Sequence, residues 1–150
     1  QRNFQGYSTF GGADILSFGM SSISQIPGAY WQNLKELAEY TGSVERDERP
    51  ITRGYLLTAE DRIRREVIMR LMCHLELNYE QLSRELDIDF KNFFAAALES
   101  LADMEADELV VLSNDRLLVT DLGRLVIRNI AMRFDAYQKT GSEQRYSKTI

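Results

Sequence analysis

Apolar residues recur at helical spacing through much of residues 58–137 of this 150-residue chain. The pattern predicts a helix over 58–75, a shorter helix after Asn78, a long helix over 90–105 and a last helix over 120–137. Between the last two helices, the apolar runs 109–112 and 117–119 flank the turn-rich residues 113–116, which is typical of a β-hairpin.

The first of these helices has the clearest signals. Thr58 and Asp61 are spaced as a capping pair, in which the threonine hydroxyl accepts a free backbone N–H of the first turn. An apolar stripe follows from Ile63 to Leu75. We expect the i,i+4 pairs Glu60/Arg64 and Asp61/Arg65 on the solvent side.

Helix, short helix, helix, hairpin, helix is the order of a winged-helix fold. We therefore predict a mainly α chain whose residues 58–138 form a winged-helix-like C-terminal domain, followed by a tail over 139–150. In a DNA reader, the helix over 90–105 would need basic residues on its exposed face. It offers Lys91 against Glu99, Asp103 and Glu105, so this surface would be repelled by DNA.

The first 42 residues have a different pattern. The apolar run Ile15–Phe18 indicates a buried parallel strand, followed by a Gly/Ser turn over 19–24 and a helix from Ala29 to Tyr40. One such unit cannot bury both faces of its strand, so it needs a partner. A tight loop of small residues is the alternative for this turn. Residues 43–57 are predicted to be a linker, in which 51–57 could add a third strand to the winged-helix sheet.

Composition and charge limit the classes of function. The chain is 44% hydrophobic and 27% charged, as in a globular protein, and its net charge of −5 gives no attraction for phosphate backbones. Its one cysteine cannot form an internal disulfide or a cluster cage. This cysteine usage fits a reducing compartment, so we expect a cytoplasmic protein. No apolar run predicts a membrane span. We expect a monomer that binds neither nucleic acid nor membrane. Because the chain lacks an initiator methionine, we expect it to begin inside a longer protein.

Several stretches of the chain resemble oxygen-independent coproporphyrinogen III oxidases of the radical SAM family. They begin with Arg2 to Thr9, including Asn3-Phe4-Gln5-Gly6-Tyr7, and continue with Gly12-Ala13-Asp14, Phe18-Gly19 and Ser21 to Ser24. The others are Gln32-Asn33, Lys35-Glu36-Leu37, Arg53-Gly54, Leu57-Thr58, Ile63-Arg64-Arg65, Val67-Ile68, Gly123-Arg124-Leu125, Ile127 to Ile130, Phe134-Asp135 and Tyr146 to Ile150.

The resemblance implies that residues 1–42 are the end of a radical SAM barrel. It also implies oxidative decarboxylation of two propionates of coproporphyrinogen III, giving protoporphyrinogen IX in haem biosynthesis. The cofactors would be S-adenosyl-L-methionine (SAM) and a [4Fe–4S] cluster. The family's Cys-x3-Cys-x2-Cys motif is missing here, so this chain should be inactive alone and form a lid over the rest of the barrel.

By position in the family's motifs, Phe4, Gln5 and Ile23 match residues near its SAM sites. Backbone groups of a Gly/Ser turn can meet a nucleoside or a carboxylate, and an isoleucine can pack on adenine. These three residues are our candidate cofactor-binding residues. The sequence predicts no catalytic residue and no metal ligand in this chain.

Other chemistry-bearing residues have structural explanations. Cys73 and His74 are neighbours on a helix and point about 100° apart, so we expect a buried cysteine and a surface histidine rather than a catalytic pair. Arg53 could meet a substrate propionate, although an exposed linker arginine is the commoner case. Arg124, Arg128 and Arg133 could steer an anion, but a solvated face or salt bridges are favoured.

Two alternatives to the oxidase remain open. One is a winged-helix binding module without catalysis. The other is a paralogue that keeps the fold but handles haem or another tetrapyrrole.

Overall fold

The computed structural model describes residues 2–3, 6–7 and 13–137, which form two compact units, 1–73 and 74–150. Phe4 and Gln5, two of the candidate cofactor-binding residues, lie outside the described residues, as does the tail predicted over 139–150.

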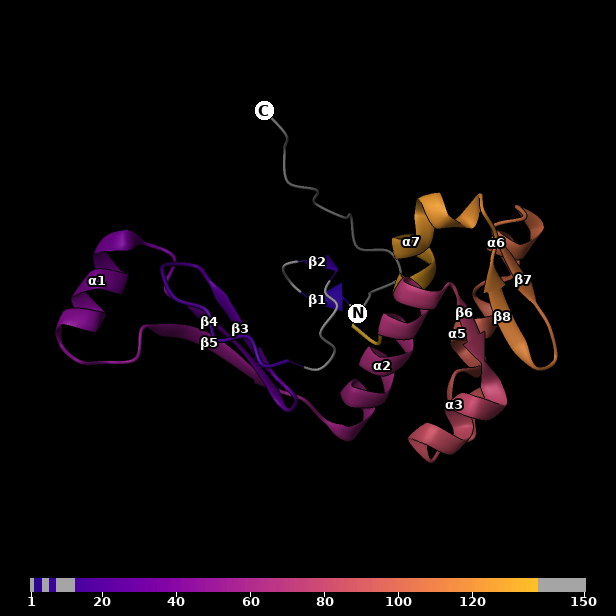
Figure 1. The fold of residues 1–150 in the computed structure, drawn as a ribbon, viewed down its shortest axis with the longest axis horizontal. Coiled ribbons are helices and arrows are strands. Elements are labelled where there is room, and N and C mark those ends of the chain that lie inside the picture. The colour runs from indigo at the N-terminus through magenta and orange to yellow at the C-terminus, as the bar shows by residue number, and fades with distance from the viewer. Residues whose placement is uncertain (1, 4–5, 8–12, 138–150) are drawn as a thin grey trace. The chain divides into compact units, whose positions relative to one another are not determined.

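The first unit contains two antiparallel sheets (Figure 1). The strands β1 (Arg2–Asn3) and β2 (Gly6–Tyr7) pair with each other. A larger sheet has the order β3-β4-β5, formed by β3 (Ile23–Ile26), β4 (Ala29–Asn33) and β5 (Ile51–Leu56). Pro27 and Gly28 form the two-residue connection of the β3–β4 hairpin, a composition typical of turns.

Two elements predicted for this region are wrong. Within residues 13–22 there is no parallel strand over Ile15–Phe18; Ile15 forms only an isolated antiparallel bridge with Gln25. Residues Ala29–Asn33 are a strand instead of the start of a helix. The sequence Ala-Tyr-Trp-Gln-Asn contains aromatic residues that fit a pleated, half-buried surface, and Pro27-Gly28 is a hairpin turn rather than a break.

The predicted linker also contains regular structure. The helix α1 (Leu37–Glu45) begins eight residues later than expected and continues through Thr41-Gly42-Ser43, where we expected it to end. The strand β5 pairs along its length with β4, so it belongs to the sheet of the first unit and not to the winged-helix sheet.

The capped helix of the first unit is confirmed. The helix α2 (Ala59–His74) buries Val67, Leu71 and Met72. The ion pair Arg64–Glu60 forms with a distance of 2.8 Å between Nε and Oε1. The second predicted pair is wrong, because Asp61 is only 8% exposed and accepts hydrogen bonds from other residues.

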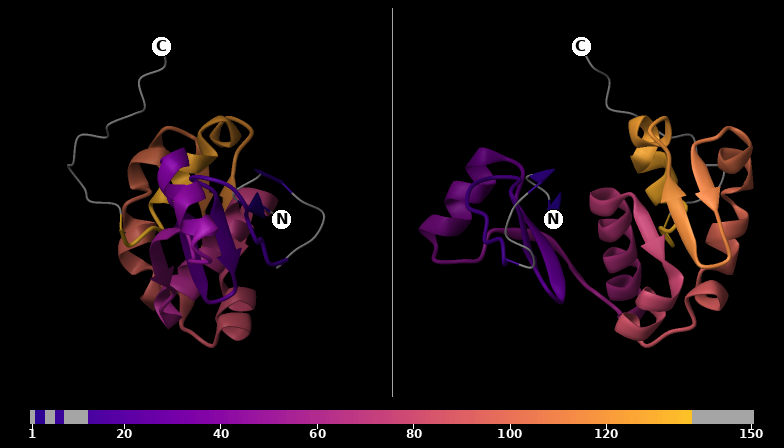
Figure 2. Two further views of the ribbon diagram at one scale, coloured as in Figure 1. Left: turned by 90° about the vertical axis from the view of Figure 1, so that its left-hand side faces the viewer. Right: turned by 45° about the vertical axis from the view of Figure 1, so that its right-hand side comes forward.

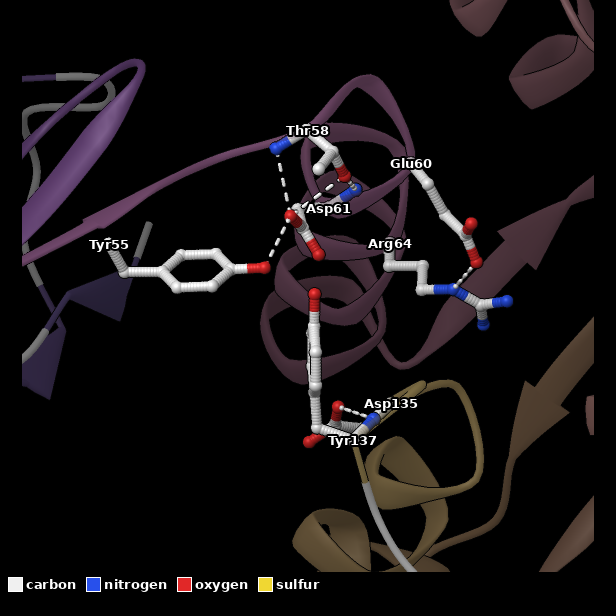
Figure 3. Close-up of polar contacts among 7 residues, drawn as sticks. All are labelled: Tyr55, Thr58, Glu60, Asp61, Arg64, Asp135 and Tyr137. Carbon is white, nitrogen blue, oxygen red and sulfur yellow. Dashed lines mark hydrogen bonds and ion pairs between the residues drawn. The ribbon is translucent and has the colours of Figure 1, made fainter.

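Asp61 connects β5 with α2 (Figure 3). Its Oδ2 accepts hydrogen bonds from the backbone N–H of Thr58 at 2.8 Å, the hydroxyl of Thr58 at 2.8 Å and the hydroxyl of Tyr55 at 3.0 Å. In return, the N–H of Asp61 donates to the Thr58 hydroxyl at 3.1 Å. This capping pair begins the helix, and Tyr55 ties it to the last strand of the sheet.

The second unit starts with β6 (Glu76–Asn78) and α3 (Tyr79–Leu86). The side chain of Asn78 accepts from the N–H of Gln81 at 2.9 Å, so Asn78 caps the short helix that was predicted after it. The strands β7 (Val110–Leu112) and β8 (Arg116–Val119) form the predicted hairpin, orange in Figures 1 and 2. They join β6 in an antiparallel sheet of order β6-β8-β7.

The two later helices of this unit are shorter than predicted. The helix expected over 90–105 consists of three pieces, α4 (Phe90–Phe93), α5 (Ala95–Glu99) and α6 (Ala102–Ala106). The helix expected over 120–137 is the 3-10 turn η1 (Gly123–Val126) followed by α7 (Ile127–Met132). Leu122 and Leu125, two apolar residues of the predicted helix, are 53% and 82% exposed. A Cβ on Gly123 would lie 2.0 Å from the Leu109 carbonyl oxygen, so close backbone contact fixes this turn.

An aromatic cluster forms the core of the second unit. The centroid of the Phe94 ring lies 4.8 Å from that of Phe90 and 5.5 Å from that of Phe134. The Tyr79 ring stacks on Phe90 with a centroid distance of 5.0 Å. All four are at most 5% exposed. Burial raises the pKa of Tyr79 to about 12, with Asp115 and Glu105 adding to the effect.

The described chain combines helices with small antiparallel sheets, and strands contribute to both units, so the mainly α prediction is not confirmed.

Replacement of Asp61 tests how much the β5–α2 connection contributes. Asp61→Ala should lower the free energy of unfolding by about 2 kcal/mol or more, because it removes a cap and leaves Thr58 and Tyr55 without their acceptor. Urea unfolding followed by circular dichroism measures this change. Glu60→Ala, in the same turn, removes only an exposed ion-pair partner and should cost about 0.5 kcal/mol or less. Equal losses for the two variants would contradict this role of Asp61.

Candidate functional site

One face of the β3-β4-β5 sheet carries the candidate site. Residues directly opposite each other in an antiparallel sheet project from the same face. The pairing places Ile23, Gln32 and Arg53 in one row across the three strands. The next row on that face contains Gln25, Tyr30 and Tyr55. The candidate cofactor-binding residue Ile23 therefore shares a row with an amide and a guanidinium.

The row is held together by two side-chain hydrogen bonds. The Gln32 amide nitrogen Nε2 donates to the carbonyl oxygen of Ser21 at 2.9 Å. Its Oε1 accepts from the Arg53 Nε at 3.0 Å. Arg53 is exposed, as are the other residues of β5. This exposure agrees with the role favoured from the sequence, and Arg53 lies in the short strand that was possible within the predicted linker.

The second row faces α2. The Arg65 guanidinium lies over the Tyr30 ring, 5.4 Å from its centroid, which is within the range of a cation–π interaction. Burial raises the pKa of Tyr30, and the positive charge of Arg65 opposes this effect. Tyr55, in the same row, donates to Asp61. The sequence pattern did not reveal this arrangement, because Asp61 and Arg65 have i,i+4 spacing and were assigned to a surface pair.

Ile23 begins a strand rather than lying in a Gly/Ser turn. Its carbonyl oxygen accepts a hydrogen bond from the Ser17 hydroxyl at 2.6 Å, and its side chain is half-buried. The tight turn itself precedes it, at Gly19, which has a φ of +96°. The N–H of Gly19 donates to the Tyr40 hydroxyl, and its carbonyl oxygen accepts from the side chains of Ser22 and Asn33. These bonds fix the loop beside β3.

The remaining candidate residues are dispersed. His74 is exposed, as predicted, but Cys73 is half-buried rather than buried. Arg133 pairs with Asp103 at 2.8 Å, as expected of a salt bridge. Arg124 and Arg128 are exposed. In the second unit Lys91, Glu99, Asp103 and Glu105 are all exposed, so the surface of α4 to α6 has the acidic character expected from the sequence.

The cysteine content does not fit an iron–sulfur cluster within this chain. Such clusters are held mainly by thiolates, and Cys73 is the only cysteine in the sequence. The described residues contain no group of three or more histidine, cysteine or acidic side chains arranged to hold a metal ion. Among those same residues, no helix has both the length and the apolar character needed to cross a bilayer.

Comparison with known proteins gives one consistent result. A sequence model described as the HemN C-terminal domain matches residues 57–126. The oxygen-independent coproporphyrinogen III oxidase of Thermostichus vulcanus is 44% identical over 151 residues, which cover 100% of this chain and 46% of that protein. The oxidase of the same name from Escherichia coli K12 is 42% identical over 150 residues, covering 99% of this chain and 33% of the relative.

A solved structure agrees with these sequences. The chain superimposes on coproporphyrinogen III oxidase (HemN) from Escherichia coli, described as a radical SAM enzyme, with a TM-score of 0.86 and 44% identity. The match covers 91% of this chain and 32% of that structure. This chain thus spans less than half the length of these relatives. Residues 57–126 match the model of the HemN C-terminal domain, within a sequence similar along its whole length to oxygen-independent coproporphyrinogen III oxidases.

Proposed function

We propose that this chain is the C-terminal part of an oxygen-independent coproporphyrinogen III oxidase. The observation that carries the proposal is the extent of the similarity: 44% identity over all of the chain, with a TM-score of 0.86 over 91% of it. The substrate of such an enzyme is coproporphyrinogen III, and two of its propionates become vinyl groups with loss of carbon dioxide. This reaction belongs to haem biosynthesis.

The chemistry of the reaction would be supplied from outside this chain. SAM and a [4Fe–4S] cluster are the cofactors proposed for the full-length enzyme, and the cluster ligands would belong to other parts of that enzyme, because this chain has one cysteine. The role proposed for this chain is to cover the substrate and limit its contact with water.

The partner proposed for the first unit is the rest of the radical SAM barrel. Exposed apolar side chains in this unit support the proposal. Phe18 is 89% exposed, Leu16 63% and Leu56 80%. Apolar side chains with this exposure can bury their surface against another part of a longer protein. The neighbouring loop is fixed by the Gly19, Ser22 and Asn33 hydrogen bonds, so these side chains are presented on an ordered backbone.

A winged-helix-like arrangement is proposed for residues 58–138. The chain order α2, β6, α3, then α4 to α6, then the β7–β8 hairpin supports it, as does the sheet order β6-β8-β7. The acidic surface of α4 to α6 disfavours DNA reading. The proposed division of the chain remains 1–42, 43–57, 58–138 and 139–150. The strand β5, which lies within 43–57, pairs with the sheet formed by residues of 1–42.

Oxidase activity of the full-length protein is the direct test of this function. With SAM and a reductant, under anaerobic conditions, it should convert coproporphyrinogen III to protoporphyrinogen IX and release two molecules of carbon dioxide per substrate. Chromatography of the oxidised porphyrins measures the product. A protein with a full cluster and bound SAM that releases no carbon dioxide would favour a paralogue. Tight, salt-sensitive DNA binding by this chain would instead favour the binding module.

Phe4, Gln5 and Ile23 are proposed to lie near SAM in the full-length enzyme. For Ile23 the row that it shares with Gln32 and Arg53 supports this proposal, since an apolar side chain beside polar groups suits an adenosine with a charged tail. Ile23→Asp should weaken SAM binding about tenfold or more in a calorimetric titration of the full-length protein, because it places a charge where an apolar contact is needed.

Ile26→Asp is the matched control for this titration. Ile26 lies in the same strand and is also half-buried, but it projects from the opposite face. It should leave SAM affinity close to that of the unmodified protein. Unchanged affinity in Ile23→Asp, with native circular dichroism, would contradict the assignment of Ile23.

A further inference from the structure

We propose that Arg53 and Arg65 form a carboxylate-binding face on the β3-β4-β5 sheet. This inference rests on the proposed function, because it assigns the face to a carboxylate of the oxidase's ligands. Two sources share that chemistry: a propionate of the porphyrinogen and the carboxylate of SAM. Separate measurements of coproporphyrinogen III binding and SAM binding distinguish these two sources.

Arg53 is oriented without being neutralised. Its Nε donates to the Gln32 side-chain oxygen, and Gln32 is itself fixed by its bond to Ser21. A carboxylate in the place of Gln32 would cancel the charge, whereas the amide fixes the plane of the guanidinium and leaves the charge intact. Arg53 forms no ion pair with any described residue. Arg53 is exposed, and its two terminal nitrogens form no hydrogen bond with the described residues, so they are available for the bidentate geometry that arginine offers to a carboxylate.

Arg65 is held in the same manner by a neutral group. Its guanidinium lies over the Tyr30 ring, and within the described residues it forms no ion pair. Tyr30 and Gln32 are two residues apart in β4, so they project from the same face about 7 Å from each other. Arg53 lies in one row of this face, and Arg65 of α2 lies over Tyr30 in the adjoining row. The carboxylate of Asp61, one helical turn before Arg65, accepts hydrogen bonds from Thr58 and Tyr55.

Three other arginines of the first unit are paired with carboxylates instead. Arg46, Arg64 and Arg70 each form an ion pair with a glutamate at 3.2 Å or less. The chain has more acidic than basic residues, 23 against 18, so carboxylate partners are plentiful. Two cations oriented by an amide and by an aromatic ring suit an external anion. Coproporphyrinogen III, with four propionates, and SAM, with one carboxylate, both offer a matching group.

The test compares three single variants in the full-length protein. Arg53→Gln and Arg65→Gln each remove one cation from the face. Arg62→Gln removes the same charge from an exposed residue of α2 that forms no side-chain hydrogen bond or ion pair with the described residues. Arg53→Lys keeps the charge but not the planar fork. Circular dichroism confirms that each variant is folded, which is expected because Arg53 is exposed and Arg65 half-buried.

Binding is measured separately for the two ligands, coproporphyrinogen III by anaerobic ultrafiltration and SAM by calorimetry. Arg53→Gln and Arg65→Gln should each weaken binding of one of these ligands about tenfold or more, because a charge-assisted contact is lost. The ligand that is weakened identifies the source of the carboxylate. Arg53→Lys should recover part of the loss, and Arg62→Gln should bind as the unmodified protein does.

Two outcomes separate this inference from the proposed function. If Arg53→Gln and Arg65→Gln bind both ligands as tightly as Arg62→Gln does, the carboxylate-binding face is wrong, even when the protein is an active oxidase. If the unmodified protein binds coproporphyrinogen III and SAM but releases no carbon dioxide, the proposed oxidase function fails, while the binding comparison still decides the role of the two arginines.

Discussion

The hydrogen bonds of one buried carboxylate determine how the first unit is built. Asp61 accepts from Thr58 and from Tyr55, so a single side chain begins α2 and joins it to β5. Because Asp61 is used in this way, Arg65, four residues later, is not paired with it and lies over Tyr30 instead. The geometry of the helix start thereby determines which charges reach the face of the sheet.

That face differs from the surfaces of the second unit. It combines Ile23, Gln32 and Arg53 in one row with Tyr30 beneath Arg65 in the next. The pieces α4 to α6 instead expose Glu99, Asp103 and Glu105. A polycarboxylate substrate would be attracted to the first surface and repelled by the second. The charge distribution thus agrees with the oxidase proposal and disfavours DNA as a ligand.

The sequence predicted elements well where local signals and burial agreed. The Thr58/Asp61 cap, the Asn78 cap and the β7–β8 hairpin follow from short-range chemistry. Prediction failed where strand pairing, rather than the local pattern, decides the structure. Ala29–Asn33 has apolar residues that fit either period, and only pairing with Ile23–Ile26 and Ile51–Leu56 makes it a strand. The site face was missed for the same reason, since Gln32 and Arg53 are 21 residues apart. Ile23 was selected from the family resemblance alone.

Hydrogen–deuterium exchange of the full-length protein, with and without coproporphyrinogen III and SAM, tests most directly whether the sheet face of the first unit is the ligand-binding surface. We expect slower exchange of backbone amides in peptides that cover β4, β5 and the first two turns of α2 when both ligands are present. Peptides from α4 to α6 should change little. Protection confined to 90–106, or no protection in 29–33 and 51–65 under saturating ligand, would contradict this expectation.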